Sequence, residues 1–305
     1  MHIENIADLR LLAETERQGS LTGASRVLGM TPAAASATLK RIERRLGLRL
    51  FERSTRAMRL TPEGATLLDY ARRAMELLEE GEAQALSGSG AIAGTLRLAA
   101  PSDLTRSVLL PWLDDFLAAH PGVHLVLQAT DRVQDVVRDA VDLALRYGTL
   151  ADSRLVARRL ADTRRVLCAA PAYLARHGVP RTPLELTGHN CLSFHIDSRR
   201  YVAWRFEREG VWTEVRVDGD RTTDDAAIAH QWALAGAGVI YKSRLDVAHD
   251  LRAGRLVPLL DGWRGESYPL NAVLPGSRFV PQRAKRLVDF LAARFAAEAA
   301  ANPSP

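Results

Sequence analysis

The stretch from Ser20 to Gly64, SLTGASRVLGMTPAAASATLKRIERRLGLRLFERSTRAMRLTPEG, predicts more of the fold than any other part of the chain. Ser20 or Thr22 can cap a short helix that ends near residue 28. Thr31 followed by Pro32 predicts the start of another helix, because an N-cap hydroxyl and a proline at the first helical position are both favourable there. A first helix near residues 4–17 precedes this stretch.

The helix that begins at Pro32 has one apolar face and is followed by a short hairpin. Leu50-Phe51 and Met58–Leu60 flank the polar segment Glu52–Ala57, which suits a two-stranded turn. A second cap-plus-proline signal at residues 61–62 opens a long helix that runs to about Ser87. Short helices, a hairpin and a long helix in this order are typical of a winged helix-turn-helix, a module that reads DNA. The apolar face of the predicted third helix carries Ala35, Leu39, Ile42 and Leu46.

The distribution of charge supports a nucleic-acid partner. Of the net charge of +5, all lies in residues 1–61, which hold eleven Lys/Arg and six Asp/Glu, while the remaining residues hold thirty of each. A basic module joined to a neutral domain is the pattern expected of a DNA-binding protein.

The side of the third helix opposite its apolar face is the predicted DNA-reading surface. Small residues near its N-terminus allow close approach to the major groove, where alanines contact thymine methyls and hydroxyls bond base edges. Basic residues later in the helix and on the hairpin suit phosphates or the minor groove, although each one alone is equally compatible with a solvated helix face. The predicted DNA-binding residues are Thr31, Pro32, Ala33, Ser36, Ala37, Thr38, Lys40, Arg41, Arg44, Arg53, Arg56 and Arg59.

The long helix over residues 62–87 requires a partner for its apolar face. Leu67, Ala71, Met75, Leu78 and Ala85 mark that face. We expect a homodimer through this helix, and the alternative is packing against the chain's own C-terminal domain.

Residues 88–93 form a predicted hinge, and after it strands and helices alternate. Residues 95–99, 124–129, 143–147 and 166–169 are expected strands, and residues 107–120 an expected helix. Asp131 resembles the first residue of a capping box opening a helix to residue 141. Such alternation predicts an α/β domain with a largely parallel sheet.

Residues 5–64 resemble the N-terminal domain of the LysR-type transcriptional regulators. The matching text is Gly19-Ser20-Leu21-Thr22, Ala24, Thr31 to Ser36, the run from Arg41-Ile42-Glu43 to Glu52-Arg53, and Leu60-Thr61 with Gly64. The resemblance extends along nearly the whole chain. It implies an α-rich winged helix-turn-helix domain (1–61), a linker helix (62–87), a hinge (88–93) and an effector domain (94–302) similar to type 2 periplasmic binding proteins. That domain divides into subdomain I (94–162 and 268–302) and subdomain II (163–267).

The chain departs from the family pattern in the reading helix. The family commonly has Ser-Gln-Pro-Ala at positions 31–34 and a long polar or basic residue at 37, where this chain has Thr-Pro-Ala-Ala and Ala37. We therefore expect a reader that relies more on methyl contacts, hairpin contacts and DNA shape.

The resemblance also implies a small effector, often aromatic or carboxylated, in a cleft between the two subdomains. Strand ends and helix N-termini suit anionic groups, because free N–H groups point into them. Asp103 and Asp224 near this cleft make a simple dianion less suitable. The predicted effector-binding residues are Ser102, Thr105, Arg146, His195, Thr222, Thr223 and Tyr241; caps, loop hydroxyls or an Arg146 pair with Asp142 or Asp131 would explain several of them equally well.

Several classes of protein are disfavoured. We find no catalytic, nucleotide or metal motif, so neither an enzyme nor a cofactor or metal site is expected. Neither a signal peptide nor an apolar run long enough to span a membrane is seen, which favours the cytoplasm over an exported solute-binding protein. Cys168 and Cys191 suit two buried thiols better than a redox pair. The alternatives left are a ligand-responsive regulator, dimeric or tetrameric, and a ligand-independent architectural DNA-binding protein.

Overall fold

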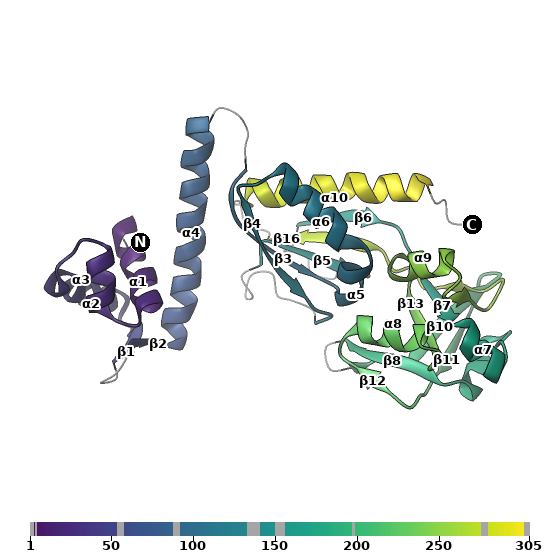
Figure 1. Ribbon diagram of the computed structural model, residues 1–305. Coiled ribbons are helices and arrows are strands. Elements are labelled where there is room, and N and C mark those ends of the chain that lie inside the picture. Colours follow the sequence, from purple (N-terminus) through teal and green to yellow (C-terminus); the bar gives the residue numbers. More distant parts are fainter. Residues whose placement is uncertain are drawn as a thin grey trace. The chain divides into compact units, whose positions relative to one another are not determined.

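The computed structural model describes residues 3, 5–53, 58–87, 92–132, 141–149, 156–196, 199–275 and 280–301. The chain divides into two compact units, Met1–Gly94 and Thr95–Pro305 (Figure 1). No helix among the described residues is both long and apolar enough to cross a lipid bilayer.

The first unit consists of helices around a two-stranded hairpin. Each of its first three helices begins at a capping side chain: Asn5, Ser20 and Thr31 accept hydrogen bonds from the backbone N–H groups of Ala7, Gly23 and Ala34. The elements are α1 (Ile6–Gln18), α2 (Leu21–Val27), α3 (Pro32–Leu46), β1 (Phe51–Arg53), β2 (Met58–Leu60) and α4 (Pro62–Ser87).

The core of the first unit joins α1, α3, the hairpin and α4. Leu39 and Ile42 on α3 pack with Leu12, Leu50, Phe51 and Leu68, and each such buried side chain stabilises the fold by about 1.5–3 kcal/mol. Residues Leu67 and Ala71 of the predicted dimer face therefore lie half-buried or buried against the helix's own unit. Among the described side chains of α4, the large apolar ones that are exposed are Tyr70 and Leu78, at 50% and 47%.

Two features fix the hairpin against α3 and α4. The carboxylate of Glu43 accepts hydrogen bonds from the backbone N–H groups of Leu50 (2.8 Å) and Phe51 (3.3 Å). Gly64 allows α4 to pass close to the chain before β1, because a Cβ there would lie 2.0 Å from the carbonyl oxygen of Leu50. Glu43 of the Arg-Ile-Glu segment and Gly64 of the Leu-Thr-x-x-Gly segment are therefore explained by their contacts with the chain around Leu50.

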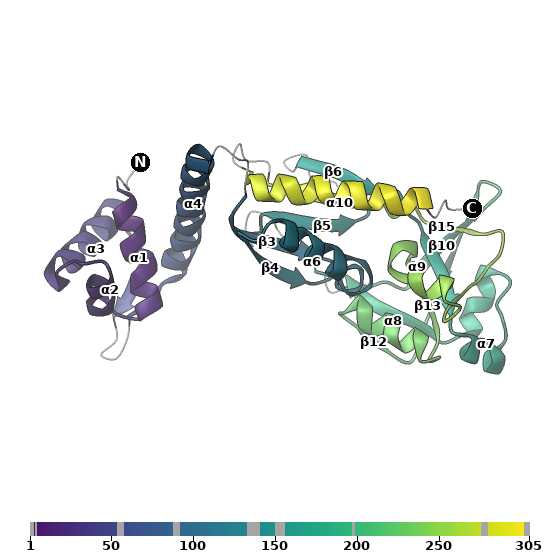
Figure 2. The same ribbon diagram turned by 45° about the horizontal axis from the view of Figure 1, so that its top comes forward.

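Subdomain I of the second unit is a five-stranded sheet with the order β4-β3-β5-β16-β6. Helices α6 and α10 lie side by side on one face of this sheet (Figure 2), where the rings of Trp112 and Phe295 meet edge-on at 4.8 Å. The elements are β3 (Gly94–Ala100), α5 (Ser102–Leu104), the π-helical turn η1 (Thr105–Leu109), α6 (Leu110–Ala119), β4 (Val123–Ala129), β5 (Leu143–Tyr147), β6 (Val156–Ala161), β16 (Leu270–Leu274) and α10 (Gln282–Ala301).

Subdomain II holds a six-stranded and a three-stranded sheet around a core that includes Trp204, Phe206 and Tyr241. Its helices are α7 (Pro171–His177), the 3-10 helix η2 (Pro183–Gly188), α8 (Ala226–Leu234) and α9 (Arg244–Arg252). Its strands are β7 (Arg165–Ala169), β8 (Cys191–Ile196), β9 (Arg199–Arg200), β10 (Ala203–Arg208), β11 (Val211–Arg216), β12 (Thr222–Thr223), β13 (Val239–Ser243), β14 (Val257–Pro258) and β15 (Arg264–Gly265).

Two crossover segments, 162–164 and 266–269, join the subdomains. They run antiparallel and are hydrogen-bonded to each other: the N–H of Tyr268 donates to the carbonyl of Thr163 at 2.7 Å, and Arg164 pairs with Ser267. The guanidinium carbon of the buried Arg165 lies 3.9 Å from the centre of the Tyr268 ring.

The prediction of a largely parallel sheet is wrong, because both large sheets are mixed. β3 and β5 are parallel, whereas β16 runs antiparallel to both β5 and β6. In subdomain II, β13 is parallel to β8 and antiparallel to β7. The antiparallel pairs involve the strands that follow the crossovers: β16 after the second crossover in subdomain I, and β7 after the first crossover in subdomain II. The helix expected after Asp131 falls mostly on residues 133–140, which lie outside the described residues.

Candidate functional site

The outward side of α3 is a continuous exposed stripe. Ala33, Ala37, Lys40 and Arg44 recur along it and are all exposed, while Ala35, Leu39 and Ile42 on the opposite side are buried. Pro32 occupies the first helical position and is also exposed, and Ser36 and Thr38 are half-buried beside the stripe. The face therefore presents small residues first and basic residues towards the helix C-terminus.

Two predicted contacts of α3 have structural partners. The Thr31 hydroxyl caps the helix by accepting from the N–H of Ala34 at 3.1 Å. Arg41 donates to both carboxylate oxygens of the buried Asp8, at 2.7 and 2.9 Å, and so ties α3 to α1. Both of these hydrogen bonds come from one guanidinium nitrogen, and the Arg41 side chain is 47% exposed, so its contact with phosphates stays a prediction.

The hairpin supplies fewer described contacts. Arg59 is exposed on β2, opposite Glu52 on β1. The backbone of Arg53 pairs with Met58. Arg56 lies outside the described residues.

In the second unit, polar groups from both subdomains meet at the N-terminus of α8. Ser102 follows β3, Asp131 follows β4, and both belong to subdomain I. The Asp131 carboxylate accepts hydrogen bonds from the Ser102 hydroxyl (2.5 Å), the Ser102 N–H (3.2 Å) and the N–H of Ala226 (2.7 Å). The N–H of Ala227 donates to the Ser102 hydroxyl at 3.3 Å. We name these four residues the Asp131 latch.

An ion pair reinforces the latch at its rim. Arg106 donates to the carbonyl of Ser102 at 3.2 Å and lies 3.3 Å from a carboxylate oxygen of Asp225, the N-cap residue of α8. Free N–H groups at a helix N-terminus favour an anion. Here that anion is the chain's own Asp131.

The other predicted effector-binding residues fall into two groups. Thr222 and Thr223 on β12 are half-buried near the latch; the Thr222 hydroxyl bonds Ser193 at 3.0 Å, and the Thr223 hydroxyl accepts from the N–H of Asp225 at 3.1 Å. His195 on β8 and Arg146 on β5 are also half-buried.

Tyr241 and Thr105 do not fit the predicted role, and we correct both assignments. Tyr241 is 1% exposed, and its hydroxyl donates to the carbonyl of Arg205 (2.7 Å) and accepts from the N–H of Glu266 (2.9 Å). The Thr105 hydroxyl is buried and donates to the carbonyl of Pro101 at 2.8 Å. Both side chains are part of the framework because their hydrogen-bonding groups are already used.

Next to the latch lies a buried ion cluster that the sequence analysis missed. It consists of Asp103 from subdomain I and His230, Lys242, Asp246 and Asp250 from subdomain II, all less than 9% exposed. The Lys242 ammonium lies 2.5 Å from Asp103 and 3.3 Å from Asp246, and the two ring nitrogens of His230 lie 3.0 Å from Asp103 and 3.1 Å from Asp250. The cluster therefore joins the two subdomains electrostatically.

The carboxyls of this cluster differ in their affinity for protons. Burial alone would raise the pKa of Asp103, but the charge of Lys242 and the hydrogen bond with His230 outweigh it and lower that pKa to about 2. Burial raises the pKa of Asp246 to about 6, because Lys242 offsets the loss of water only in part. The Tyr147 hydroxyl of subdomain I donates to Asp246 at 2.6 Å.

The sequence contains signals for two of these residues, Asp131 of the latch and Lys242 of the ion cluster. Asp131 follows one strand as Ser102 follows its neighbour, so the two share one edge of the sheet; we interpreted Asp131 only as a helix cap or a partner of Arg146. Lys242 interrupts the apolar run of β13, which is buried throughout, and a charge in a buried strand requires partners. The described residues contain no group of three or more His, Cys, Asp or Glu side chains placed to hold a metal ion.

Comparisons with known proteins agree with both units. Residues 6–65 match the family model of the bacterial regulatory helix-turn-helix proteins of the LysR family, and residues 89–296 match that of the LysR substrate binding domain. An uncharacterised regulator of Escherichia coli, YhjC, is 32% identical over 301 residues, covering 95% of this chain and 97% of that protein. A transcriptional repressor of Pseudomonas aeruginosa is 33% identical over 279 residues, covering 91% and 88%.

Solved structures lead to the same assignment. The structure of CrgA, a LysR-type transcriptional regulator from Neisseria meningitidis, is 29% identical, covers 96% of this chain and 99% of that chain, and has a TM-score of 0.61. Full-length LysG from Corynebacterium glutamicum shares the fold at 21% identity, with a TM-score of 0.63 and coverage of 96% and 99%. These relatives are regulators rather than enzymes. This chain belongs to the LysR family of bacterial transcriptional regulators.

Proposed function

We propose that this regulator binds operator DNA through α3, with the hairpin β1–β2 on the flanking backbone, and that a small effector between subdomains I and II changes that binding. The observation that carries the DNA half is the exposed stripe of α3. Alanines at 33 and 37 allow the backbone to approach thymine methyls, and Lys40 and Arg44 at the far end suit phosphates. Neither basic side chain has a carboxylate partner among the described residues.

Fluorescence anisotropy with DNA upstream of the protein's own gene tests this half. Tight binding that exceeds binding to scrambled DNA by about a thousandfold and weakens steeply with salt supports the proposal. Lys40→Gln and Arg44→Gln should each weaken binding and lower the salt slope by about one. Arg10→Gln, an equal charge change at an exposed site on α1, is the matched control and should change neither. Equal loss in all three variants would refute α3 as the reading element.

The apolar residues left exposed on α4 support a homodimer. Tyr70, Ala74 and Leu78 recur every fourth residue and are all exposed, so a second α4 would bury one continuous stripe. Two-fold pairing predicts an imperfect inverted repeat in the operator, and a pair of dimers would form the tetramer. Leu78→Glu should shift the light-scattering mass towards the monomer, whereas Asp69→Asn, on a different side of α4 from this stripe, should not.

For the effector half, we infer that the ligand competes with the Asp131 latch. The N–H groups at the N-terminus of α8 and the Ser102 hydroxyl are hydrogen-bond donors that form a site for an acceptor. Without a ligand, the internal carboxylate of Asp131 fills this site. An effector that presents its own acceptor oxygen would displace Asp131 and change the contact between the subdomains. The effector then acts by population shift between two interdomain arrangements.

Chemical rescue tests the latch. Asp131→Ala empties the position and removes three hydrogen bonds to a charged acceptor, so it should destabilise the protein by about 3 kcal/mol or more. In this variant, sodium acetate should raise Tm more than sodium chloride of equal ionic strength does, because acetate can occupy the vacated position. Asp115→Ala, which removes an exposed partner of Arg294, should respond equally to both salts. Equal responses in Asp131→Ala would refute the anion position.

A further inference from the structure

A large cavity lies against the crossover segments and is separate from the Asp131 latch. It has a volume of about 940 Å³ and is open to solvent. The first crossover with the start of β7 (162–167), Arg264 and Gly265 of β15, Ser267 of the second crossover, and residues 258–263 form its walls, together with Phe206 and Arg244. We name it the hinge cavity. None of the predicted effector-binding residues lines it.

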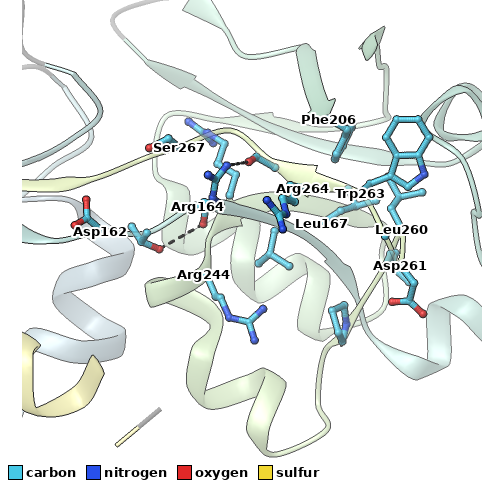
Figure 3. Close-up of a pocket in the computed structure, with 17 residues that line it drawn as sticks. Asp162, Arg164, Leu167, Phe206, Arg244, Leu260, Asp261, Trp263, Arg264 and Ser267 are labelled. Atoms are coloured by element: carbon cyan, nitrogen blue, oxygen red, sulfur yellow. Dashed lines mark hydrogen bonds between the residues drawn. The ribbon is translucent and has the colours of Figure 1, made fainter. Parts of the chain in front are cut away.

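The hinge cavity is basic. Figure 3 shows the side chains of Arg164, Arg264 and Arg244 in its middle, with Asp162 and Asp261 at opposite ends. The buried Arg165 also belongs to the lining. Four arginines against two aspartates give the lining a net charge of +2.

The two guanidinium groups of Arg244 and Arg264 are available to a ligand. Neither forms an ion pair or a side-chain hydrogen bond with another residue in the described part of the chain. By contrast, Arg164 donates to the carbonyl of Gly265 at 3.3 Å, and Asp162 is paired with Arg159 at 2.9 Å. Arginines without carboxylate partners suit bidentate binding of carboxylate or phosphate.

The remaining wall is apolar and aromatic. Trp263 and Phe206 line the upper right of the view in Figure 3, with Leu260 and Leu167 beside them. The indole N–H of Trp263 is buried and has no acceptor among the described residues. A buried donor without an acceptor is unfavourable, and a ligand oxygen would satisfy it. The wall thus suits a planar ring carrying a polar substituent.

We propose that the hinge cavity binds a small dianion joined to a planar apolar group, a class that includes aryl phosphates and aromatic dicarboxylates. The charge of +2 matches a dianion, the guanidinium groups of Arg244 and Arg264 hold it, and Trp263 and Phe206 receive the ring. The volume lies within the usual range for sites that enclose a small molecule.

Such a ligand would act on the hinge itself. Arg164 lies on the first crossover, Arg264 precedes the second, and Arg244 begins α9 of subdomain II. One molecule held by Arg244 and Arg264, next to Arg164, would stiffen the crossovers where they meet subdomain II. The cavity is therefore a second input to the regulator, and it does not depend on which molecule occupies the cleft at α8.

Phenyl phosphate is the probe, with inorganic phosphate and phenol as its two halves. Isothermal titration of the full-length protein should show phenyl phosphate binding at least tenfold more tightly than inorganic phosphate, and phenol binding not at all. Tryptophan fluorescence should change on binding, and Trp263→Phe should abolish that change. Equal affinity for phenyl phosphate and phosphate, or a fluorescence change on binding that persists in Trp263→Phe, would overturn the proposal.

Charge variants separate the hinge cavity from other basic surfaces. Arg244→Gln with Arg264→Gln should weaken phenyl phosphate binding at least tenfold with little change in Tm. Arg216→Gln, an exposed arginine on β11 outside the cavity, should bind as the wild type does. Lys40→Gln is the control for binding to the basic surface of α3, which would attract any phosphate. If phenyl phosphate binds in the hinge cavity, this variant should also leave its binding unchanged. Retained binding in the double variant, or loss in either control, would refute the site. Ser102→Ala changes the Asp131 latch and tests whether the hinge cavity is independent of the cleft. It should have no effect on the affinity for phenyl phosphate.

Discussion

Replacing Lys242 by methionine tests the buried ion cluster most directly. Lys242 is 2% exposed, and its ammonium is within 3.3 Å of both Asp103 and Asp246. Methionine fills nearly the same volume but leaves two buried carboxyls without their main counter-charge. Breaking a buried pair in this way costs about 3–5 kcal/mol. For a unit of this size, that corresponds to a fall in Tm of roughly 6–20 °C.

Urea unfolding followed by tryptophan fluorescence is a suitable assay. All five tryptophans lie beyond residue 94, so the signal reports the effector unit and not the DNA-binding unit. Lys285→Met is the matched control, because Lys285 is an exposed lysine on α10 of the same unit. This control should change the free energy of unfolding by less than about 0.5 kcal/mol.

The pH dependence gives the experiment a second readout. The folded-state pKa of Asp246, about 6, is raised above the unfolded value. Its contribution to stability is therefore fully present below the unfolded pKa of about 4 and is lost as pH rises through about 6. Without Lys242, the carboxyls of Asp103 and Asp246 bind protons still more readily, so the deficit of the variant should be smaller at pH 5 than at pH 8. A loss below about 1 kcal/mol at pH 8, or a deficit that does not shrink at pH 5, would refute the reasoning.

Three further outcomes are expected. Burial raises the pKa values of both Cys168 and Cys191 to about 12. Neither thiol should therefore react with iodoacetamide in the native protein at pH 8, whereas both should react in urea. Mass spectrometry measures the extent of alkylation in each case. Gly64→Ala should destabilise the first unit by more than about 1 kcal/mol, measured by far-UV circular dichroism, because its Cβ would lie 2.0 Å from a backbone oxygen. Arg41→Met should leave Asp8 buried without its partner and lower the stability of the same unit by about 2–3 kcal/mol, whereas Arg44→Met on the exposed side of α3 should have little effect.

Local signals were sufficient for the DNA-binding unit. Thr31-Pro32 marks the start of α3 because capping and proline geometry act within a few residues, and the apolar spacing of Leu39 and Ile42 gives its buried face. The role of Arg41 could not be seen in this way, since its partner Asp8 is brought close only by the packing of α1 on α3.

The effector unit was less predictable because its contacts join distant segments. The sequence shows Ser102 as a polar residue at a strand end, but its partners come from the end of β4 and from α8. Nothing near Lys242 in the sequence indicates Asp103, which approaches it from the other subdomain. The mixed direction of the sheets depends on how the chain enters each sheet from the two crossovers, and strand spacing does not contain that information.

The place of β16 in its sheet has a consequence for the order of synthesis. This strand lies between β5 and β6, yet it leaves the ribosome after every residue of subdomain II. Until then β5 and β6 have no common neighbour, and two long stretches of sheet edge stay open. We therefore expect the DNA-binding unit to fold first, the uninterrupted subdomain second and the interrupted one last, so that a nascent chain can hold DNA before it can respond to a ligand.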